Sequence, residues 1–303
     1  MRHRKAWAAL ALSLVCLFTG CVDQSGPAVA SGMVEGKDPA GNGTIAATSV
    51  AVMQICEKLD LDLVGVPKTS LAEIPARYAD ATALGSPMNP DLEILSQVSP
   101  EWVLSPSSLQ GDLQPKYEAA GLKYGFLNLK TIFGMYQSIQ DMGELFDRQV
   151  QADALLQEFE QYYMTYQETH KNQPAPRVLV LMGLPGSYVV ATENSYAGSL
   201  VALAGGQNVY AGTDQEFLNV NTEDMIQKDP DIILRTAHAM PDSVMKMFDE
   251  EFRTNDIWKH FSAVKENRVY DLPPEYFGMS ANFTYSQALE VLDEILYGKG
   301  DAS

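Results

Sequence analysis

The segment Leu145-Phe-Asp-Arg-Gln-Val-Gln-Ala-Asp-Ala-Leu-Leu-Gln-Glu-Phe-Glu-Gln-Tyr-Tyr-Met-Thr-Tyr166 decides the fold class. Its apolar side chains recur at helical spacing, at Leu145, Phe146, Ala152, Leu155, Leu156, Phe159, Tyr163 and Tyr166. Between Ile132 and about His170 there is no proline and no strand signal, and Pro174 and Pro176 follow. This pattern predicts one helix of roughly 35 residues, well beyond the average helix of a globular protein.

On both sides of this helix, short apolar runs alternate with helical patterns. Before it, strands are expected at 44–48, 63–66, 102–105 and 124–129, with helices at 49–59, 90–98 and 113–120. After it, strands are expected at 177–182, 188–192, 231–235 and 268–272, with helices near 198–204, 222–228 and 286–297. The alternation predicts an α/β protein of two lobes, each with a small, mostly parallel sheet, joined by the one long α-helix.

The predicted domains follow from this rhythm. They are an N-terminal lobe at 44–130, the linking helix at 131–172, a C-terminal lobe at 173–298 and a polar tail at 299–303. A cleft between two lobes is a favoured place for a ligand. A single rigid linking helix implies that the lobes make only small closure motions.

The N-terminus predicts secretion and lipidation. Basic residues at 2–5 precede an apolar run from Ala6 to Phe18, and Thr19-Gly20-Cys21 follows. Residues 1–20 are therefore expected to be a signal peptide, because the run is too short to span a bilayer. The cysteine after two small residues resembles a bacterial lipobox, with Phe18 where leucine is usual, so Cys21 is the predicted site of the acyl chains, palmitate among them; an ordinary signal peptide with an incidental cysteine is the alternative. Residues 21–43 are rich in Ser, Gly, Pro, Asp and Ala, a composition typical of a flexible tether.

Charge and motifs exclude several functions. The formal net charge is −18, and it becomes −21 when residues 1–20 are removed. Nucleic acid is therefore not an expected partner, and the membrane is expected to hold the chain by its lipid anchor alone. Cys56 is the one cysteine left to the mature chain beside Cys21, and its apolar helical pattern favours a core position. The chain lacks a nucleophile elbow, a phosphate loop, a His-Glu-x-x-His pair and a paired-cysteine metal site, so no enzyme is expected.

Seven runs of the sequence carry a resemblance to a known family. The resemblance covers nearly all of the chain from Thr44 to about Tyr297. The seven runs are 47–52, 59–67, 85–91, 181–188, 231–241, 247–252 and 254–260. In these runs the chain resembles the helical-backbone substrate-binding lipoproteins of ABC importers, which serve siderophores, cobalamin and haem, and among them the haem receptors of Gram-positive bacteria.

The resemblance implies an extracytoplasmic lipoprotein on the outer face of the cytoplasmic membrane. It implies capture of haem b (Fe-protoporphyrin IX), the transported ligand, in the inter-lobe cleft. Delivery to an ABC permease with its ATPase would then serve iron acquisition. A cell-surface haem-donor protein is the expected partner upstream.

The resemblance also implies two iron ligands, Met88 and His238, one from each lobe. Met88 lies between Pro87 and Pro90 in a turn rather than on an apolar helical face, although most methionines fill cores. His238 follows the expected strand 231–235, so it is placed at the carboxyl end of a strand, although a surface or capping histidine fits too. A thioether and an imidazole are an accepted axial pair for haem iron. His170 and His260 are weaker candidates, because His170 ends the polar linking helix and His260 lies in Trp258-Lys-His-Phe261, which is typical of a packing segment.

Contacts to the porphyrin and its propionates are expected at the starts of helices and in loops. Thr48-Ser49-Val50-Ala51 opens the first helix of the N-terminal lobe, where free N–H groups favour a carboxylate. By resemblance, Val50 and Ala51 contact haem, as does the loop at Thr69 and Ser70. Other candidates have open alternatives: Lys68 as a solvated lysine, and Tyr188, Phe277 and Met279 as core residues.

Two acidic residues, one in each lobe, follow a turn and begin a helix. Glu93 lies in Asp91-Leu-Glu-Ile, and Glu223 lies in Asn221-Thr-Glu-Asp-Met. By resemblance, these positions meet arginines of the permease. Stabilisation of the helix dipole is the alternative, and both roles are compatible.

Other ligands and functions fit less well. A ferric siderophore calls for clustered arginines, and arginine is sparse in the loops expected to face the cleft. A corrinoid like cobalamin is a further alternative on the same fold. A passive adhesion lipoprotein would not need the two acidic positions.

Overall fold

The computed structural model describes residues 44–69, 72–237 and 240–298, which all belong to one compact unit. Cys21 with the signal peptide and tether, Ser70, His238 and the tail at 299–303 lie outside the described residues.

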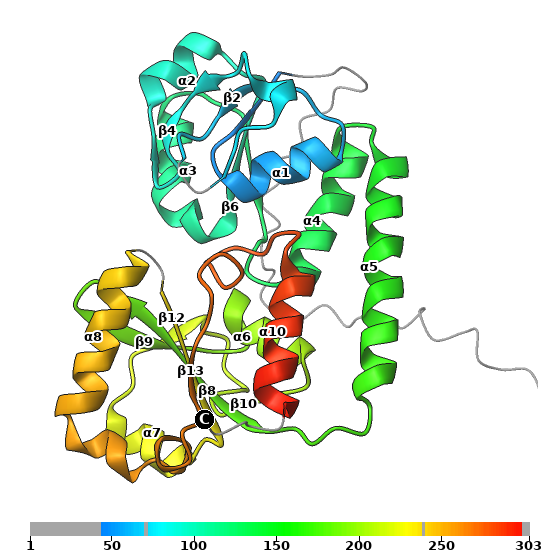
Figure 1. Cartoon of the computed structure of the whole chain (residues 1–303). Helices are drawn as coiled ribbons and strands as arrows, with labels where there is room; N and C mark the ends of the chain where they lie inside the picture. The colour runs from blue at the N-terminus through cyan, green and yellow to red at the C-terminus, as the bar shows by residue number, and fades with distance from the viewer. Residues whose placement is uncertain (1–43, 70–71, 238–239, 299–303) are drawn as a thin grey trace, which may run out of the picture. The chain divides into compact units, whose positions relative to one another are not determined.

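The N-terminal lobe alternates strands and helices as the sequence predicts (Figure 1). Its elements are β1 (Ile45–Ala47), α1 (Val50–Lys58), β2 (Leu63–Val66), η1 (Ala76–Tyr78), β3 (Thr82–Ala83), β4 (Gly85–Ser86), β5 (Asn89–Pro90), α2 (Leu92–Val98), β6 (Trp102–Pro106), η2 (Ser107–Leu109), α3 (Gln110–Ala119) and β7 (Tyr124–Leu127). Five strands form a parallel sheet in the order β3-β2-β1-β6-β7, and β4 and β5 form a separate hairpin.

Alternation along the strands explains the layers of this lobe. Ile45 and Ala47 of β1 pack into the core cluster that contains α1, whereas Ala46 packs into the cluster beneath α2 and α3. Because neighbouring residues of a strand point to opposite faces, helices cover both sides of the sheet.

The C-terminal lobe resumes the alternation. Its elements are β8 (Arg177–Leu184), β9 (Ser187–Ala191), α6 (Tyr196–Leu203), β10 (Gln207–Asn208), β11 (Phe217–Leu218), α7 (Thr222–Lys228), β12 (Ile232–Ala237), α8 (Pro241–Thr254), η3 (Asp256–His260), α9 (Ser262–Lys265), β13 (Val269–Asp271) and α10 (Tyr285–Tyr297). The sheet order is β11-β9-β8-β12-β13, with β10 also paired to β8. β9 runs antiparallel to β8, because the turn Pro185-Gly186, with Gly186 at φ +82°, reverses the chain. The other pairings of β8 and β12 are parallel, so the predicted fold class is confirmed.

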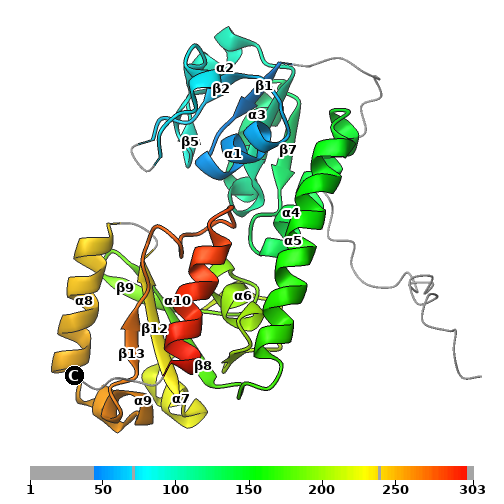
Figure 2. The ribbon, with the colours of Figure 1, turned by 45° about the vertical axis from the view of Figure 1, so that its right-hand side comes forward.

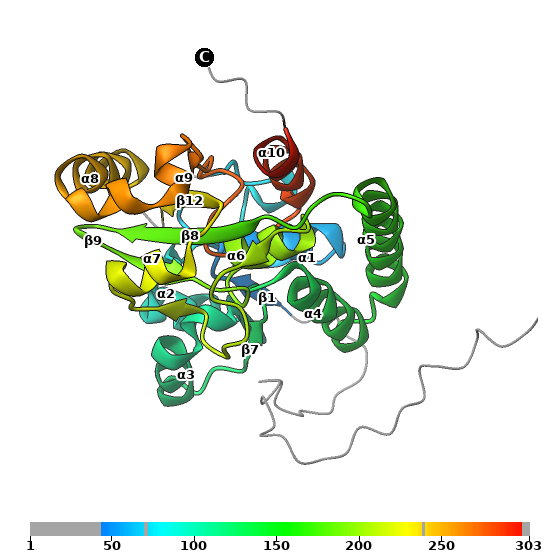
Figure 3. The same cartoon turned by 90° about the horizontal axis from the view of Figure 1, so that it is seen from below.

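The single linking helix of the prediction is wrong, because two helices occupy its place. α4 (Ile132–Leu145) and α5 (Gln149–His170) lie side by side in Figures 1 and 3, and they overlap in the view of Figure 2. They run antiparallel, since the ring of Phe133 lies 5.8 Å from that of Tyr163, while Gly143 closely approaches Ala152 near the turn. Asp147 adopts a left-handed φ of +56° and ends the helical path. The helical periodicity continues through both helices, and the turn has no glycine or proline to mark it.

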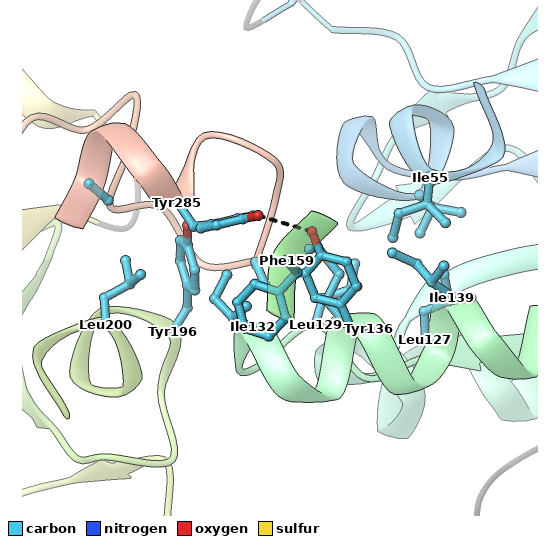
Figure 4. Close-up of a cluster of buried hydrophobic side chains, with 14 of the residues drawn as sticks. Ile55, Leu127, Leu129, Ile132, Tyr136, Ile139, Phe159, Tyr196, Leu200 and Tyr285 are labelled. Atoms are coloured by element: carbon cyan, nitrogen blue, oxygen red, sulfur yellow. Dashed lines mark hydrogen bonds between the residues drawn. The ribbon is translucent and has the colours of Figure 1, made fainter. Parts of the chain in front are cut away.

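One core cluster extends from the N-terminal lobe through these helices into the C-terminal lobe. It contains Ile55 of α1, Ile139 of α4, Phe159 of α5 and Leu200 of α6, all shown in Figure 4. The rings of Tyr136 and Phe159 stack at 4.4 Å between centroids. Burying a large apolar side chain contributes about 1.5–3 kcal/mol, so this shared cluster stabilises both lobes together. Among the described helices, none combines the length and apolarity that a membrane span requires.

Candidate functional site

The carboxyl ends of the five parallel strands lie at one edge of the N-terminal sheet. Two residues, Thr48 and Ser49, separate the end of β1 from the start of α1, and the chain leaves β2 into Pro67-Lys68-Thr69. A backbone hydrogen bond of 2.8 Å from the N–H of Lys68 to the carbonyl of Gly85 joins this loop to the hairpin β4–β5. The segments that carry Val50, Lys68 and Met88 are thus gathered at the edge where open α/β sheets bind ligands.

Met88 is placed on the surface of the protein. Ser86 pairs with Asn89 in the hairpin β4–β5, so Pro87 and Met88 form its two-residue turn. The Met88 side chain is 62% exposed. Lys116 Nζ donates to Asn89 Oδ1 at 2.9 Å, which ties the hairpin to α3. The core-filling alternative is therefore excluded for Met88, and its thioether is available to a ligand.

The start of α1 is held by buried hydroxyl groups. Ser49 caps the helix, and its Oγ accepts from the N–H of Val52 at 3.3 Å. Thr48 Oγ1 lies 2.9 Å from Ser105 Oγ, which lies 3.0 Å from the hydroxyl of Tyr117, and all three residues are at most 1% exposed. Burial raises the pKa of Tyr117, so this chain of hydroxyls stays neutral. This chain of hydroxyls holds the start of α1, where the first backbone N–H groups have no acceptor within the helix.

Val50 and Ala51 are half-buried at this helix start, and they pack against the shared core on one side. Lys68 is exposed and makes no ion pair with another described residue, which agrees with either of its two expected roles. Thr69 is half-buried next to it. Ser70 lies beyond the described part of this loop.

The corresponding edge of the C-terminal sheet is formed by the carboxyl ends of β8 and β12. Ala237, the last residue of β12, is in register with Gly183 of β8, and Gly183 is in register with Tyr188 of β9. The strand ends two residues later than predicted, directly before His238 in the sequence. His238 itself lies outside the described residues, so its role stays a prediction.

α8 packs tightly against this row of residues. A Cβ atom on Gly183 would lie 2.2 Å from Val244 Cγ1 and 2.7 Å from Phe248 Cε2, so only glycine permits this approach. The ring of Tyr188 lies 5.8 Å from Phe248 and 6.1 Å from Trp258, and its hydroxyl donates to Glu251 at 3.4 Å. Burial and the nearby Glu251 raise the pKa of Tyr188 to about 12. The ring of Tyr188 is thus half-buried and joined to the core under α8.

Phe277 and Met279 follow β13 in the segment before α10. Phe277 is fully buried, so it is a core residue and the porphyrin-contact alternative is wrong for it. Met279 is half-buried and packs against the shared core from a loop, which leaves part of its side chain accessible.

Glu93 and Glu223 occupy equivalent positions in two similar helices. Each is exposed at the second position of a seven-residue helix, after the caps Asp91 and Asn221. Each helix ends in a left-handed residue, Ser99 or Asp229, and proline follows. Neither glutamate makes an ion pair with another of the described residues. Because the caps are supplied by Asp91 and Asn221, the glutamates are not themselves the capping residues.

His170, Arg235 and Arg77 are engaged in contacts with other residues of the protein. His170 Nε2 lies 3.1 Å from Asp293 Oδ2, and its Nδ1 lies 2.8 Å from the carbonyl of Tyr166. Arg235 is 8% exposed between Asp271 and Asp249. Arg77 contacts Asp60 and Asp62. Within the described ranges there is no cluster of three or more His, Cys, Asp or Glu able to hold a metal ion.

The sequence indicated the candidate ligands of this site but not the hydrogen bonds that hold their segments in place. The hydroxyl chain from Thr48 to Tyr117 and the bond from Lys116 to Asn89 join residues far apart in the sequence. No local pattern marks such pairs. The tight contact at Gly183 had a signal, since a glycine within an apolar strand indicates a close approach.

The fold, two α/β lobes with a sheet in each, is that of a binding protein. A profile of the family described as periplasmic binding protein matches residues 45–276. The chain belongs to this family.

Particular relatives and solved structures agree with this assignment. The high-affinity heme uptake system protein IsdE of Staphylococcus aureus (strain Newman) is 40% identical over 298 residues, which cover 98% of this chain and 99% of IsdE. An ABC transporter substrate-binding protein from Listeria monocytogenes EGD-e is 47% identical with a TM-score of 0.81, over 85% of this chain and 99% of that chain. S. aureus IsdE complexed with heme is 41% identical with a TM-score of 0.80, over 85% of this chain and 100% of that chain. The resemblance read from the sequence is therefore confirmed.

Proposed function

We propose that this protein is an extracytoplasmic haem-binding lipoprotein rather than an enzyme. It takes haem b as cargo between its two lobes and delivers it to an ABC permease with its ATPase. One observation supports this above others: the N-terminal lobe presents the exposed thioether of Met88 at its ligand edge, and the C-terminal lobe ends β12 one residue before His238. The likeness to IsdE, which was solved with heme, agrees with this cargo.

The proposed iron ligands are the sulfur of Met88 and an imidazole nitrogen of His238. Imidazole binds both ferric and ferrous iron, whereas a thioether favours the reduced state. With both axial positions filled, no position is left open for oxygen, which suits carriage. One ligand from each lobe also makes iron capture depend on the position of the lobes.

The haem edge and propionates are proposed to contact both lobes. The start of α1 at Val50 and Ala51, followed by Lys68, Thr69 and Ser70, supplies donors from the N-terminal lobe. The accessible parts of Tyr188 and Met279 supply apolar contacts from the C-terminal lobe. Backbone N–H groups give favourable hydrogen bonds to a carboxylate without adding a cation, as the acidic composition of the chain requires.

The chain is proposed to be anchored by acylated Cys21 to the outer face of the cytoplasmic membrane of a Gram-positive bacterium. Residues 21–43 then form the tether, and the lobes occupy 44–130 and 173–298. Cys21→Ala should release the protein into the medium or leave it unprocessed. Normal membrane retention of this variant would contradict the anchor.

Glu93 and Glu223 are proposed to dock the permease, and a cell-surface protein is proposed to donate the haem. Changing both glutamates to alanine should slow haem uptake and leave haem binding unchanged. Salt should weaken docking in the parent, because charges at the rim act mainly on association. Equal uptake by parent and double variant at low salt would reduce the two residues to stabilisers of their helices.

Absorption spectroscopy tests the cargo. Haem added to the mature protein should produce a Soret band that saturates at one haem per chain. A ferric siderophore and a cobalamin serve as competing ligands and should leave this band unchanged. The absence of a Soret band, or displacement of haem by either competitor, would contradict the proposal and favour the carrier of that competitor.

A further inference from the structure

The segment between β13 and α10, residues 272–284, is bound to the end of β12. Thr236 is the next-to-last residue of β12, and its Oγ1 donates to the carbonyl of Phe277 at 2.9 Å. Both Thr236 and Phe277 are 0% exposed. Water cannot replace this hydrogen bond, so breaking it would leave a buried carbonyl without a partner.

The same segment is bound to the N-terminal lobe four residues later. The N–H of Ala281 donates to the carbonyl of Leu129 at 2.7 Å, and Leu129 follows β7 at the ligand edge of the N-terminal sheet. Ala281 is also 0% exposed. Nearby, Lys58 Nζ at the end of α1 lies 5.7 Å from the centre of the Phe283 ring.

The segment then enters α10, which is joined to the linking helices. The hydroxyl of Tyr285, the first residue of α10, lies 3.1 Å from the hydroxyl of Tyr136 on α4 (Figure 4). The ring of Tyr285 meets Phe159 of α5 edge-on at 5.6 Å. Within nine residues, 277–285, the chain therefore contacts the end of β12, the N-terminal lobe and both linking helices.

We infer that residues 272–284 form a coupling strap between the two lobes, and that Thr236 is a positioning residue through which the strap holds the ligand end of β12. This inference rests on the proposed function, because the end of β12 matters to the ligand only if the site lies there. Four residue steps separate the two anchored groups, a length of at most about 14 Å when extended. A shift that moves the N-terminal anchor beyond this length from the other anchor must therefore be transmitted to β12 or break a buried hydrogen bond.

Met279 lies between the two anchors of the strap. Its half-buried side chain packs against the shared core and is one of the proposed haem contacts. A strap fixed at Phe277 and Ala281 holds this contact in place as well. The strap thus connects lobe position to retention of the cargo.

The test measures the rate of haem release from the full mature protein to an excess of apomyoglobin. Thr236→Val removes the hydroxyl and keeps the shape, so release should become about two- to tenfold faster, the factor that corresponds to one net hydrogen bond. Thr236→Ser retains the donor and should release haem at nearly the parent rate. Tyr78→Phe is the control, because it removes another buried hydroxyl, which donates to the Leu61 carbonyl at 2.8 Å away from the strap.

A double-mutant cycle separates coupling from local damage. Tyr136→Phe removes the hydroxyl contact at the other end of the strap and should also speed release. The effects of Thr236→Val and Tyr136→Phe should be non-additive, because both act through one element, whereas independent sites add. Strict additivity, or a lower melting temperature of Thr236→Val with an unchanged release rate, would overturn the inference. A parent protein that forms no Soret band would instead contradict the proposed function, so the two failures are distinguishable.

Discussion

The two lobes present their ligand edges in different ways. At the N-terminal edge, Met88 is 62% exposed on the two-residue turn of the hairpin β4–β5, and this hairpin is joined to α3 by the hydrogen bond from Lys116 to Asn89. At the C-terminal edge, the row Ala237, Gly183 and Tyr188 is packed under α8, with no room for one additional methyl group at Gly183. A substitution at the exposed Met88 should therefore change ligand binding with little effect on stability, whereas a substitution within the packed row should mainly change stability.

The largest expected effect is at Gly183. In Gly183→Ala the new Cβ would overlap Val244 and Phe248, which should cost about 1–3 kcal/mol of unfolding free energy. Gly111→Ala is the matched control, because Gly111 lies in α3 with no heavy atom within 4 Å of the added carbon, and it should gain about 0.5–1 kcal/mol. Urea unfolding midpoints measure both changes. Equal midpoints for the two variants would remove the claimed difference between the edges.

The next effect concerns Met88. Met88→Ala should keep some haem but weaken its affinity by about tenfold, or ~1.4 kcal/mol. It should also shift the Soret band and let cyanide bind the opened axial position. Met164→Ala is the control, since Met164 of α5 is 70% exposed and belongs to no proposed site. Both variants should keep the parent's unfolding free energy within about 0.5 kcal/mol. If Met164→Ala also bound cyanide, the loss of an exposed methionine, rather than the loss of an iron ligand, would explain cyanide binding by Met88→Ala.

The smallest effect is a pH dependence at Tyr188. Burial and Glu251 raise its pKa from 10.0 to about 12 in the folded protein. Because the folded pKa lies above the unfolded one, this stabilisation is complete below pH 10 and is lost as the pH rises toward 12. Tyr188→Phe should therefore flatten the decrease of melting temperature at alkaline pH. If the melting temperatures of parent and variant decreased equally with pH across this range, the packed state of Tyr188 would be contradicted.

Part of this comparison was predictable from the sequence. Short apolar runs located the main strands, and Pro87 and Pro90 placed Met88 in a turn. The break between α4 and α5 was not predictable, because Phe146-Asp147-Arg148 has no glycine or proline and the apolar periodicity continues beyond it. Pro185-Gly186 is a typical turn pair and indicates that the chain reverses between β8 and β9. The alternation of strands and helices nevertheless favoured parallel pairing there.

The long-range hydrogen bonds that hold the site in place were the least predictable part of the structure. The bonds from Thr236 to Phe277 and from Ala281 to Leu129 end on backbone carbonyls, so the acceptor side leaves no mark in the sequence. Phe277 resembled a ligand contact from its aromatic character, yet it is fully buried. Residue type identifies candidate ligands, whereas burial and long-range pairing decide which of them are free to bind.

The central claim is that one ligand comes from each edge, and its most direct test is a haem titration followed by absorbance. The parent, Met88→Ala and His238→Ala are compared at equal protein concentration. We expect His238→Ala to lose most of the affinity or to change the spin state of the iron, because imidazole binds iron in both oxidation states, and Met88→Ala to show the smaller change. If both variants keep the spectrum and the affinity of the parent, the assignment of these two residues is wrong and the account of the two edges fails with it.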